Sequence, residues 1–165
     1  MIKIGVENEI LFLIQKEEQG SFGSMSLIIN DFKLIDQQQG NLNDLLRDIE
    51  IFNHNFQNSF EDEFFWKEKN YPIIDNWNRF YGAKTLEDLE DPIVIDFNAL
   101  FYRVNLSFDS EFFDEFVLIG CKKGDSFYMK VWKKDFAESI YDFKVNSNDL
   151  LLTFKELEEN LHMSM

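Results

Sequence analysis

The sequence predicts a single α+β domain over residues 1–165, with a mainly antiparallel sheet covered by two amphipathic helices. Short apolar runs alternate with polar residues and are separated by short turns, a pattern typical of antiparallel strands. Two other segments carry apolar residues at helical spacing, and each needs a sheet or the other helix to bury its apolar stripe. The length fits one domain, and the two prolines and seven glycines form no linker or repeat.

The first region, Ile2 to Ile35, is rich in β-branched and aromatic residues. The polar segment Glu17 to Gly20 interrupts it, so we expect two or three strands joined by tight turns. Met25 to Ile29 is one of these expected strands.

The clearest helix is predicted over Leu42 to Phe56. Asn41 offers an N-cap, and Asp44 follows three residues later. Apolar residues recur at helical spacing, namely Leu42, Leu45, Leu46, Ile49, Phe52 and Phe56. This spacing predicts an amphipathic helix of about four turns.

The middle of the chain is predicted to form short helices and loops. A candidate helix, Ile74 to Tyr81, follows Pro72, and a short turn capped by Thr85 runs through Asp88 and ends at Pro92. A strand is expected over Tyr102 to Phe108, where apolar and polar residues alternate.

The last third predicts a hairpin and then a helix. The hairpin joins Glu115 to Cys121 and Phe127 to Trp132 around a turn at Lys122 to Asp125. Phe127, Met129 and Val131 are expected on one face of its second strand, and Tyr128, Lys130 and Trp132 on the other. Ser147 is the expected N-cap of the final helix. Its apolar stripe, expected against the sheet, consists of Leu150, Leu151, Phe154, Leu157 and Leu161.

Acidic residues dominate the composition. The chain has 31 acids and 16 bases, a net charge of −15. A surface this negative rejects nucleic acid and anionic membranes and attracts basic proteins. The charge is also uneven, with seventeen acids and six bases from Asp44 to Glu115 but five lysines and one acid from Lys122 to Lys134. A charge run is usually a solvated face, yet this asymmetry favours a binding role.

Residues for common catalytic and metal sites are few. There are two histidines, with His54 expected on the first helix and His162 in a frayed C-terminal tail, and one cysteine. They cannot supply the usual zinc ligand set, and no glycine-rich phosphate loop is present. We therefore expect no cofactor and no metal.

The cysteine and the N-terminus indicate the compartment. Cys121 has no partner for an intrachain disulfide, and its apolar surroundings predict a buried, inert thiol that suits a reducing cytoplasm. The segment from Met1 to Glu9 lacks the layout of a signal peptide, and the apolar runs are too short to span a bilayer. We expect a cytoplasmic protein.

Carboxylate pairs are the remaining source of chemistry. Asp109 with Glu111, Asp114 with Glu115, and Glu61 with Glu63 can in principle act as acid and base or bind calcium. Such pairs arise by chance among 31 acids, and the spacing of an EF-hand is absent. The prediction is a protein without enzymatic activity, and a small enzyme using a carboxylate pair stays as an alternative.

Aromatic residues among acids indicate an interface. Phe64-Phe65-Trp66 and Phe112-Phe113 are contiguous, so one regular helix or strand cannot turn all these rings toward one core. Either irregular loops fold the rings into the core, or some rings anchor a partner while carboxylates steer it. The predicted partner-binding residues are Glu61, Asp62, Glu63, Phe65, Trp66, Glu87, Asp88, Asp109, Glu111, Phe113 and Asp114.

Several segments resemble small bacterial immunity proteins of polymorphic toxin and contact-dependent growth inhibition systems. These segments are the opening Gly5 to Leu13, the strand Gly23 to Asp31, the helix Leu42 to Phe52, and the hairpin Phe113 to Trp132 with its Val131-Trp132-Lys133. The resemblance implies a cytoplasmic protein that binds one cognate toxin domain, often a nuclease, and uses no cofactor. It implies no particular binding residues, because such interfaces diversify between pairs.

The predicted mechanism is stoichiometric inhibition by a protein that is a monomer when free. Rigid carboxylates can occupy the basic groove with which a nuclease holds phosphates, and the same field draws the two proteins together. An alternative is an acidic protein that mimics nucleic acid toward many basic proteins. Binding to unrelated nucleases would distinguish this alternative from inhibition of one partner.

Overall fold

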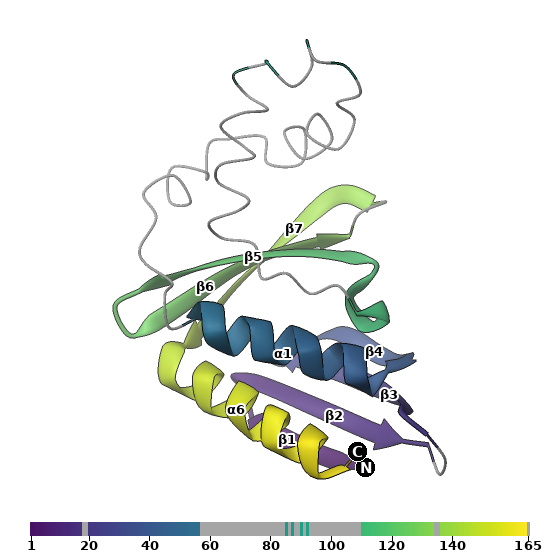
Figure 1. Cartoon of the computed structure of the whole chain (residues 1–165). Helices are drawn as coiled ribbons and strands as arrows, with labels where there is room; N and C mark the ends of the chain where they lie inside the picture. Colours follow the sequence, from purple (N-terminus) through teal and green to yellow (C-terminus); the bar gives the residue numbers. More distant parts are fainter. Residues whose placement is uncertain are drawn as a thin grey trace.

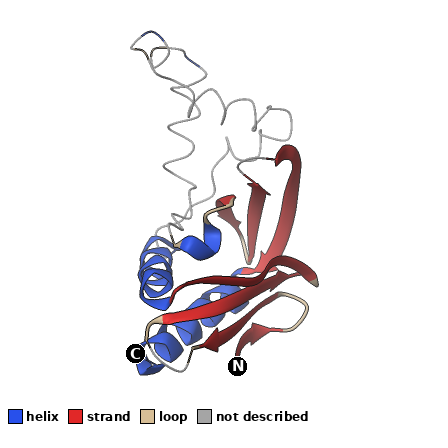
Figure 2. Ribbon diagram, turned by 90° about the vertical axis from the view of Figure 1, so that its right-hand side faces the viewer, coloured by secondary structure: helices blue, strands red, loops and turns tan. Residues whose placement is uncertain are grey.

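Two antiparallel sheets and two long helices make up the described part of the structure (Figure 1). The structure, a computed structural model, describes residues 1–17, 20–56, 85, 87, 90, 92, 110–133 and 136–164. The helices lie on one side of the strands (Figure 2). The predicted α+β class and antiparallel pairing are confirmed, but the strands form two sheets instead of the single sheet expected.

The first sheet is a meander of four strands in chain order. Its strands are β1 (Ile2–Val6), β2 (Ile10–Lys16), β3 (Phe22–Ile29) and β4 (Phe32–Asn41). Alternate residues of β2, namely Ile10, Phe12 and Ile14, are buried, as expected for a strand with one face on the core.

The fourth strand was not expected, because its sequence breaks the period of two. β4 pairs with β3 through shifts of register near Ser26, and Gln37 takes a left-handed φ of 51°. The Gln37 N–H donates a hydrogen bond of 2.9 Å to Ser26 Oγ. This bulge continues β4 through an exposed polar stretch that the pattern alone assigns to a loop.

The second sheet contains β5 (Phe116–Lys123), β6 (Ser126–Lys133) and β7 (Phe136–Asn146), paired in that order. The predicted hairpin is confirmed, with a shorter turn at Gly124 and Asp125. Phe127, Met129 and Val131 face the main core as expected. Strand β7 was missed, because Asp142 and Lys144 give its buried Phe143 and Val145 the appearance of a polar segment.

Both predicted long helices are present. The predicted N-cap is correct for the first helix and wrong for the second. Helix α1 (Leu42–Phe56) begins as predicted, since Asn41 Oδ1 accepts the Asn43 N–H at 2.9 Å. Helix α6 (Ser147–Ser164) is capped by Asn146, whose Oδ1 accepts the N–H groups of Asn148 at 2.9 Å and Asp149 at 3.3 Å. The predicted Ser147 cap is therefore wrong by one residue, and the Ser147 Oγ is buried without a hydrogen-bond partner within the described residues.

Aromatic rings join the helices to both sheets. Phe52 of α1 stacks on Phe154 of α6 with ring centroids 4.0 Å apart, and Phe154 meets Phe12 of β2 edge-on at 5.4 Å. Phe56 of α1 contacts Phe127 of β6 at 5.2 Å. One buried cluster thus includes residues of α1, α6 and both sheets.

Several expectations fall on other parts of the chain. The helix Ile74 to Tyr81 and the strand Tyr102 to Phe108 lie outside the described residues. The turn from Thr85 to Pro92 lies largely outside them.

The burial of Cys121 is confirmed, with 1% of the residue exposed. No helix in the described ranges has the length and apolar character needed to cross a membrane.

The two residues at the start of α6 should respond differently to truncation. Asn146→Ala removes the side-chain acceptor of two helical N–H groups and should lower the free energy of unfolding by about 1 kcal/mol. Ser147→Ala removes an unpaired buried hydroxyl and should be neutral or slightly stabilising. Chemical denaturation of both variants measures the difference. A larger loss for Ser147→Ala would show that Ser147 is the effective cap.

Candidate functional site

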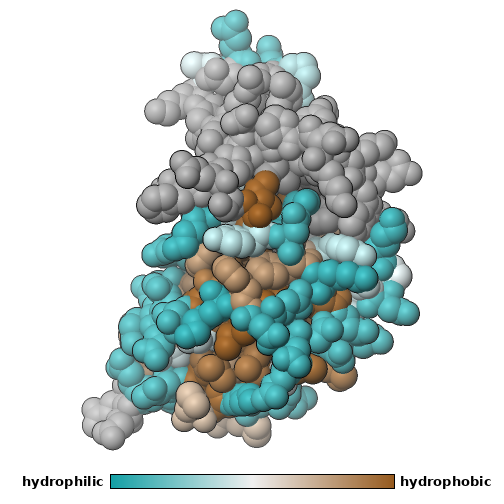
Figure 3. All heavy atoms as spheres, turned by 180° about the vertical axis from the view of Figure 1, so that it is seen from behind, coloured by the Kyte–Doolittle hydropathy of each residue, from teal (hydrophilic) through white to brown (hydrophobic). Residues whose placement is uncertain are grey.

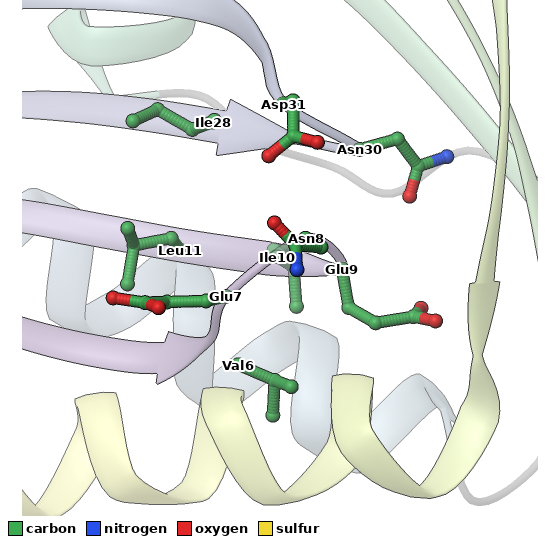
Figure 4. A pocket seen from close by; sticks show the side chains of 9 residues that line it. All are labelled: Val6, Glu7, Asn8, Glu9, Ile10, Leu11, Ile28, Asn30 and Asp31. Atoms are coloured by element: carbon green, nitrogen blue, oxygen red, sulfur yellow. The ribbon is translucent and has the colours of Figure 1, made fainter.

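A small groove lies where two turns of the first sheet meet (Figure 4). Its volume is about 200 Å³. The lining comes from the β1–β2 turn and the end of the β3–β4 hairpin, namely Val6, Glu7, Asn8, Glu9, Ile10, Leu11, Ile28, Asn30 and Asp31. The groove therefore combines an apolar floor with carboxylates and amides.

The meander explains why these two turns meet. Successive turns of an antiparallel meander alternate between the two ends of a sheet, so the first and third turns share one end. Asn8, Asn30 and Asp31 take left-handed φ values of 65°, 48° and 64°, a conformation that Asn and Asp tolerate better than most residues. The polar turns Glu7 to Glu9 and Asn30-Asp31 between apolar strands are the sequence signal that could have identified this site, and we missed it.

Hydrogen bonds hold the groove against β7. Glu9 Oε2 accepts the Asn146 N–H at 2.9 Å, and Asn30 Nδ2 donates to the Lys144 carbonyl oxygen at 3.1 Å. The Asn30 N–H also donates to the Glu9 carbonyl oxygen at 2.9 Å, which links the two turns. In Figure 4 the Glu9 and Asn30 side chains extend toward the neighbouring strand. The walls of the groove are thus fixed by the second sheet.

The other two carboxylates of the groove are exposed. Glu7 pairs with Lys3, whose ammonium donates a hydrogen bond to the carboxylate and holds the pKa of Glu7 below its ordinary value. Asp31 has no hydrogen bond or ion pair with another described residue. The rim of the groove therefore offers a carboxylate for an external cation.

This arrangement suits a long cationic side chain. The methylene groups of a lysine or arginine can cover the apolar floor, and the charged head can reach the rim carboxylates. The groove lining contains no histidine, cysteine, serine or threonine. Its titratable side chains are the carboxylates of Glu7, Glu9 and Asp31.

A second acidic surface is built on the short 3-10 helix η2 (Glu111–Phe113), at the other end of β4. The exposed Glu111 and Asp114 flank the buried rings of Phe112 and Phe113. Asp48 Oδ2 of α1 accepts the Ser110 N–H at 2.8 Å, so η2 is tied to the long helix. The two acids are consequently held on a well-packed turn.

The packing at η2 also shows whether its aromatic rings lie in the core or are available to anchor a partner. A Cβ at Gly40 would lie 3.0 Å from the Phe112 ring, so β4 and η2 are in close contact. Phe113 is fully buried in the main core. The prediction of Phe113 as a partner anchor is therefore corrected, because its ring fills the core and is not available on the surface.

Of the remaining predicted partner-binding residues, the structure describes only Glu87. Glu87 is exposed. Glu61, Asp62, Glu63, Phe65, Trp66, Asp88 and Asp109 lie outside the described residues. Of the proposed carboxylate pairs, Asp114 and Glu115 are both exposed, and Glu115 forms an ion pair of 3.1 Å with Lys133.

The outer face of the first sheet lies beside the groove. Leu11, Leu13 and Ile28 are half-buried on this face, and Leu11 pairs with Ile28 across β2 and β3. Seen from this side, apolar and hydrophilic side chains are interspersed (Figure 3). The groove and η2 lie near opposite ends of β4, about 30 Å apart at the usual rise per strand residue.

The Lys3 and Glu7 pair gives a test by titration. Because Lys3 holds the folded-state pKa of Glu7 below its value in the unfolded chain, the pair stabilises the fold fully at pH values above the unfolded-state pKa. The contribution is lost as the pH falls through the folded-state pKa. Lys3→Ala should raise the Glu7 pKa in an NMR titration, whereas Lys33→Ala, which removes the partner of Asp36, should leave it unchanged. Equal changes of the Glu7 pKa in the two variants would show that the ion pair with Lys3 does not cause the shift.

Comparison with known proteins gives one informative result. No family model matches the chain, and no curated protein matches it. Among solved structures, the fold is similar to CdiI from Burkholderia dolosa AUO158, an immunity protein of contact-dependent growth inhibition. The TM-score is 0.64 at 10% sequence identity, and the match covers 96% of this chain and 99% of the other. The resemblance predicted from the sequence is therefore confirmed at the level of the fold.

Proposed function

We propose that this protein is an immunity protein that binds and neutralises one cognate toxin domain of a contact-dependent growth inhibition system. The observation that carries the proposal is the similarity to CdiI over nearly the whole of both chains. A fold alone does not define a function, so the proposal also depends on what the surface offers.

The charge favours a basic partner. With a net charge of −15, the protein attracts a positively charged domain over long range and repels nucleic acid. A nuclease toxin carries lysines and arginines that hold phosphates, so it presents the complementary charge. We propose a nuclease as the toxin for this reason.

Two acidic surfaces fit this role. Glu111 and Asp114 are exposed on a packed turn, and the groove beside Asp31 accepts a lysine or arginine side chain. Their separation of about 30 Å is comparable to the width of a protein interface of ordinary size, about 800 Å² on each partner. The acids and aromatics predicted between Glu61 and Asp109 would complete the contact, with Trp66 as its aromatic anchor.

The proposed mechanism is occlusion without catalysis. The carboxylates would occupy the basic groove of the toxin and exclude its nucleic-acid substrate, one inhibitor for each toxin. The protein would act in the cytoplasm as a monomer and would need no cofactor. The carboxylates of Glu7, Glu9 and Asp31 in the groove lining are suited to binding a cationic side chain, which supports a binding role.

The test uses the product of a neighbouring toxin gene, because the gene of an immunity protein is expected beside that of its cognate toxin. Co-expression should restore the growth of cells that make the toxin, and the purified proteins should form a 1:1 complex. Raising the salt concentration should mainly slow association, because screening weakens long-range steering. The proposal would be overturned by failure to bind or protect, and equal binding to unrelated nucleases would favour the nucleic-acid mimic.

Variants of the acidic surfaces should change the association rate, whereas a variant of the proposed aromatic anchor should change the dissociation rate. Asp31→Lys and Glu111→Lys should slow association, whereas Trp66→Ala should speed dissociation and weaken binding by about 30-fold, the equivalent of about 2 kcal/mol. Glu159→Lys makes the same charge change at an exposed position of α6 and serves as the control. If Glu159→Lys slowed association as much as the rim variants, the net charge would determine binding and the two surfaces would not be specific contacts.

A further inference from the structure

Three side chains with metal-ligating atoms converge on the exposed side of the two long helices. They are Glu50 of α1 and Glu158 and His162 of α6. Their ligand atoms all lie within 4.8 Å of one another, and His162 Nε2 is 3.2 Å from Glu50 Oε1. The side chains of His162 and Glu50 are 55% and 46% exposed, so ions in solution can reach them.

Helix geometry and packing create this convergence. Glu158 and His162 are four residues apart on α6 and therefore share one face. The stack of Phe52 on Phe154, at 4.0 Å, fixes the neighbouring part of α1 against α6. His162 is thus part of an ordered helix with a partner on α1, which corrects the expectation that it lies in a frayed tail.

A buried amide supports one of the three ligands. Asn53 is 7% exposed and donates from Nδ2 to Glu158 Oε2 at 2.5 Å and to the Phe154 carbonyl oxygen at 3.4 Å. Its Oδ1 has no hydrogen-bond partner among the described residues. A polar group that orients a ligating carboxylate is the usual support of a metal site, and a buried oxygen without a hydrogen-bond partner can be satisfied by a cation.

We propose that Glu50, Glu158 and His162 form a zinc site that joins the C-terminal turns of α6 to α1. Zinc bonds of about 2.0 Å in tetrahedral geometry place two ligand atoms roughly 3.3 Å apart, close to the present separation of the Glu50 and His162 atoms. The imidazole favours zinc over calcium or magnesium, which prefer oxygen ligands throughout. Water would take the fourth position.

This site was excluded at the sequence level for a reason that the structure removes. In the sequence the two histidines are far apart, and together with one cysteine they are too few for the usual zinc ligand set. Glu50 and His162 are far apart in the chain, and only the packing of α1 on α6 brings them together. Carboxylates from two helices supply the ligands that cysteines would otherwise provide.

The test is titration of chelator-treated full-length protein with zinc chloride, followed by calorimetry and thermal unfolding. We expect one zinc ion per chain and a rise in melting temperature, since a ligand of the folded state stabilises it. His162→Ala and Glu50→Gln should each weaken zinc binding by on the order of 100-fold or more. His54→Ala removes the other histidine and is the matched control, with no change expected.

Measurements with other ions test the preference of the site for zinc, and toxin protection tests whether the site is separate from the proposed function. Calcium should not compete for the site, and cobalt should give the absorption bands of a tetrahedral complex. The proposal would be overturned if zinc gave no binding heat and no shift in melting temperature, or if His162→Ala bound zinc like the unchanged protein. Toxin protection by His162→Ala should be intact, so failure of this site is separable from failure of the proposed function.

Discussion

The contact of Phe52 with Phe154 is the interaction on which most of the described structure depends. It packs α1 on α6, and Phe154 extends the contact to Phe12 in the first sheet. On α1, one turn beyond Phe52, Phe56 continues it to Phe127 in the second sheet. Truncating a buried phenylalanine typically costs about 3–5 kcal/mol, a large share of the stability of one domain. Four elements from distant parts of the chain therefore share one small set of rings.

This packing places the polar features at the periphery. It brings Asn53 and Glu50 of α1 to Glu158 and His162 of α6. Asp48, nearer the start of α1, accepts a hydrogen bond from the N–H of Ser110. The groove depends on the second sheet, because Glu9 and Asn30 hydrogen-bond to the backbone of β7. These polar groups are thus positioned by packed helices and strands.

The structure also changes how the aromatic residues are understood. Phe112 and Phe113 are contiguous, and a regular element would expose one of them. A 3-10 turn at the edge of the core buries both rings and leaves Glu111 and Asp114 in solvent. Acids next to aromatic residues in the sequence can therefore mark a packed turn whose rings lie in the core and whose carboxylates remain in solvent.

The sequence by itself determined the local elements whose signals are short-range. The bounds of α1, its Asn41 cap, the β5–β6 hairpin and the burial of Cys121 follow from periodicity, capping and turn chemistry. Only the tertiary structure decided the division into two sheets, the bulged β4, the convergence of the polar turns into a groove, and the meeting of Glu50 with His162. These features depend on contacts between residues that are distant in the chain, and a local pattern carries no information about which distant side chains pack together.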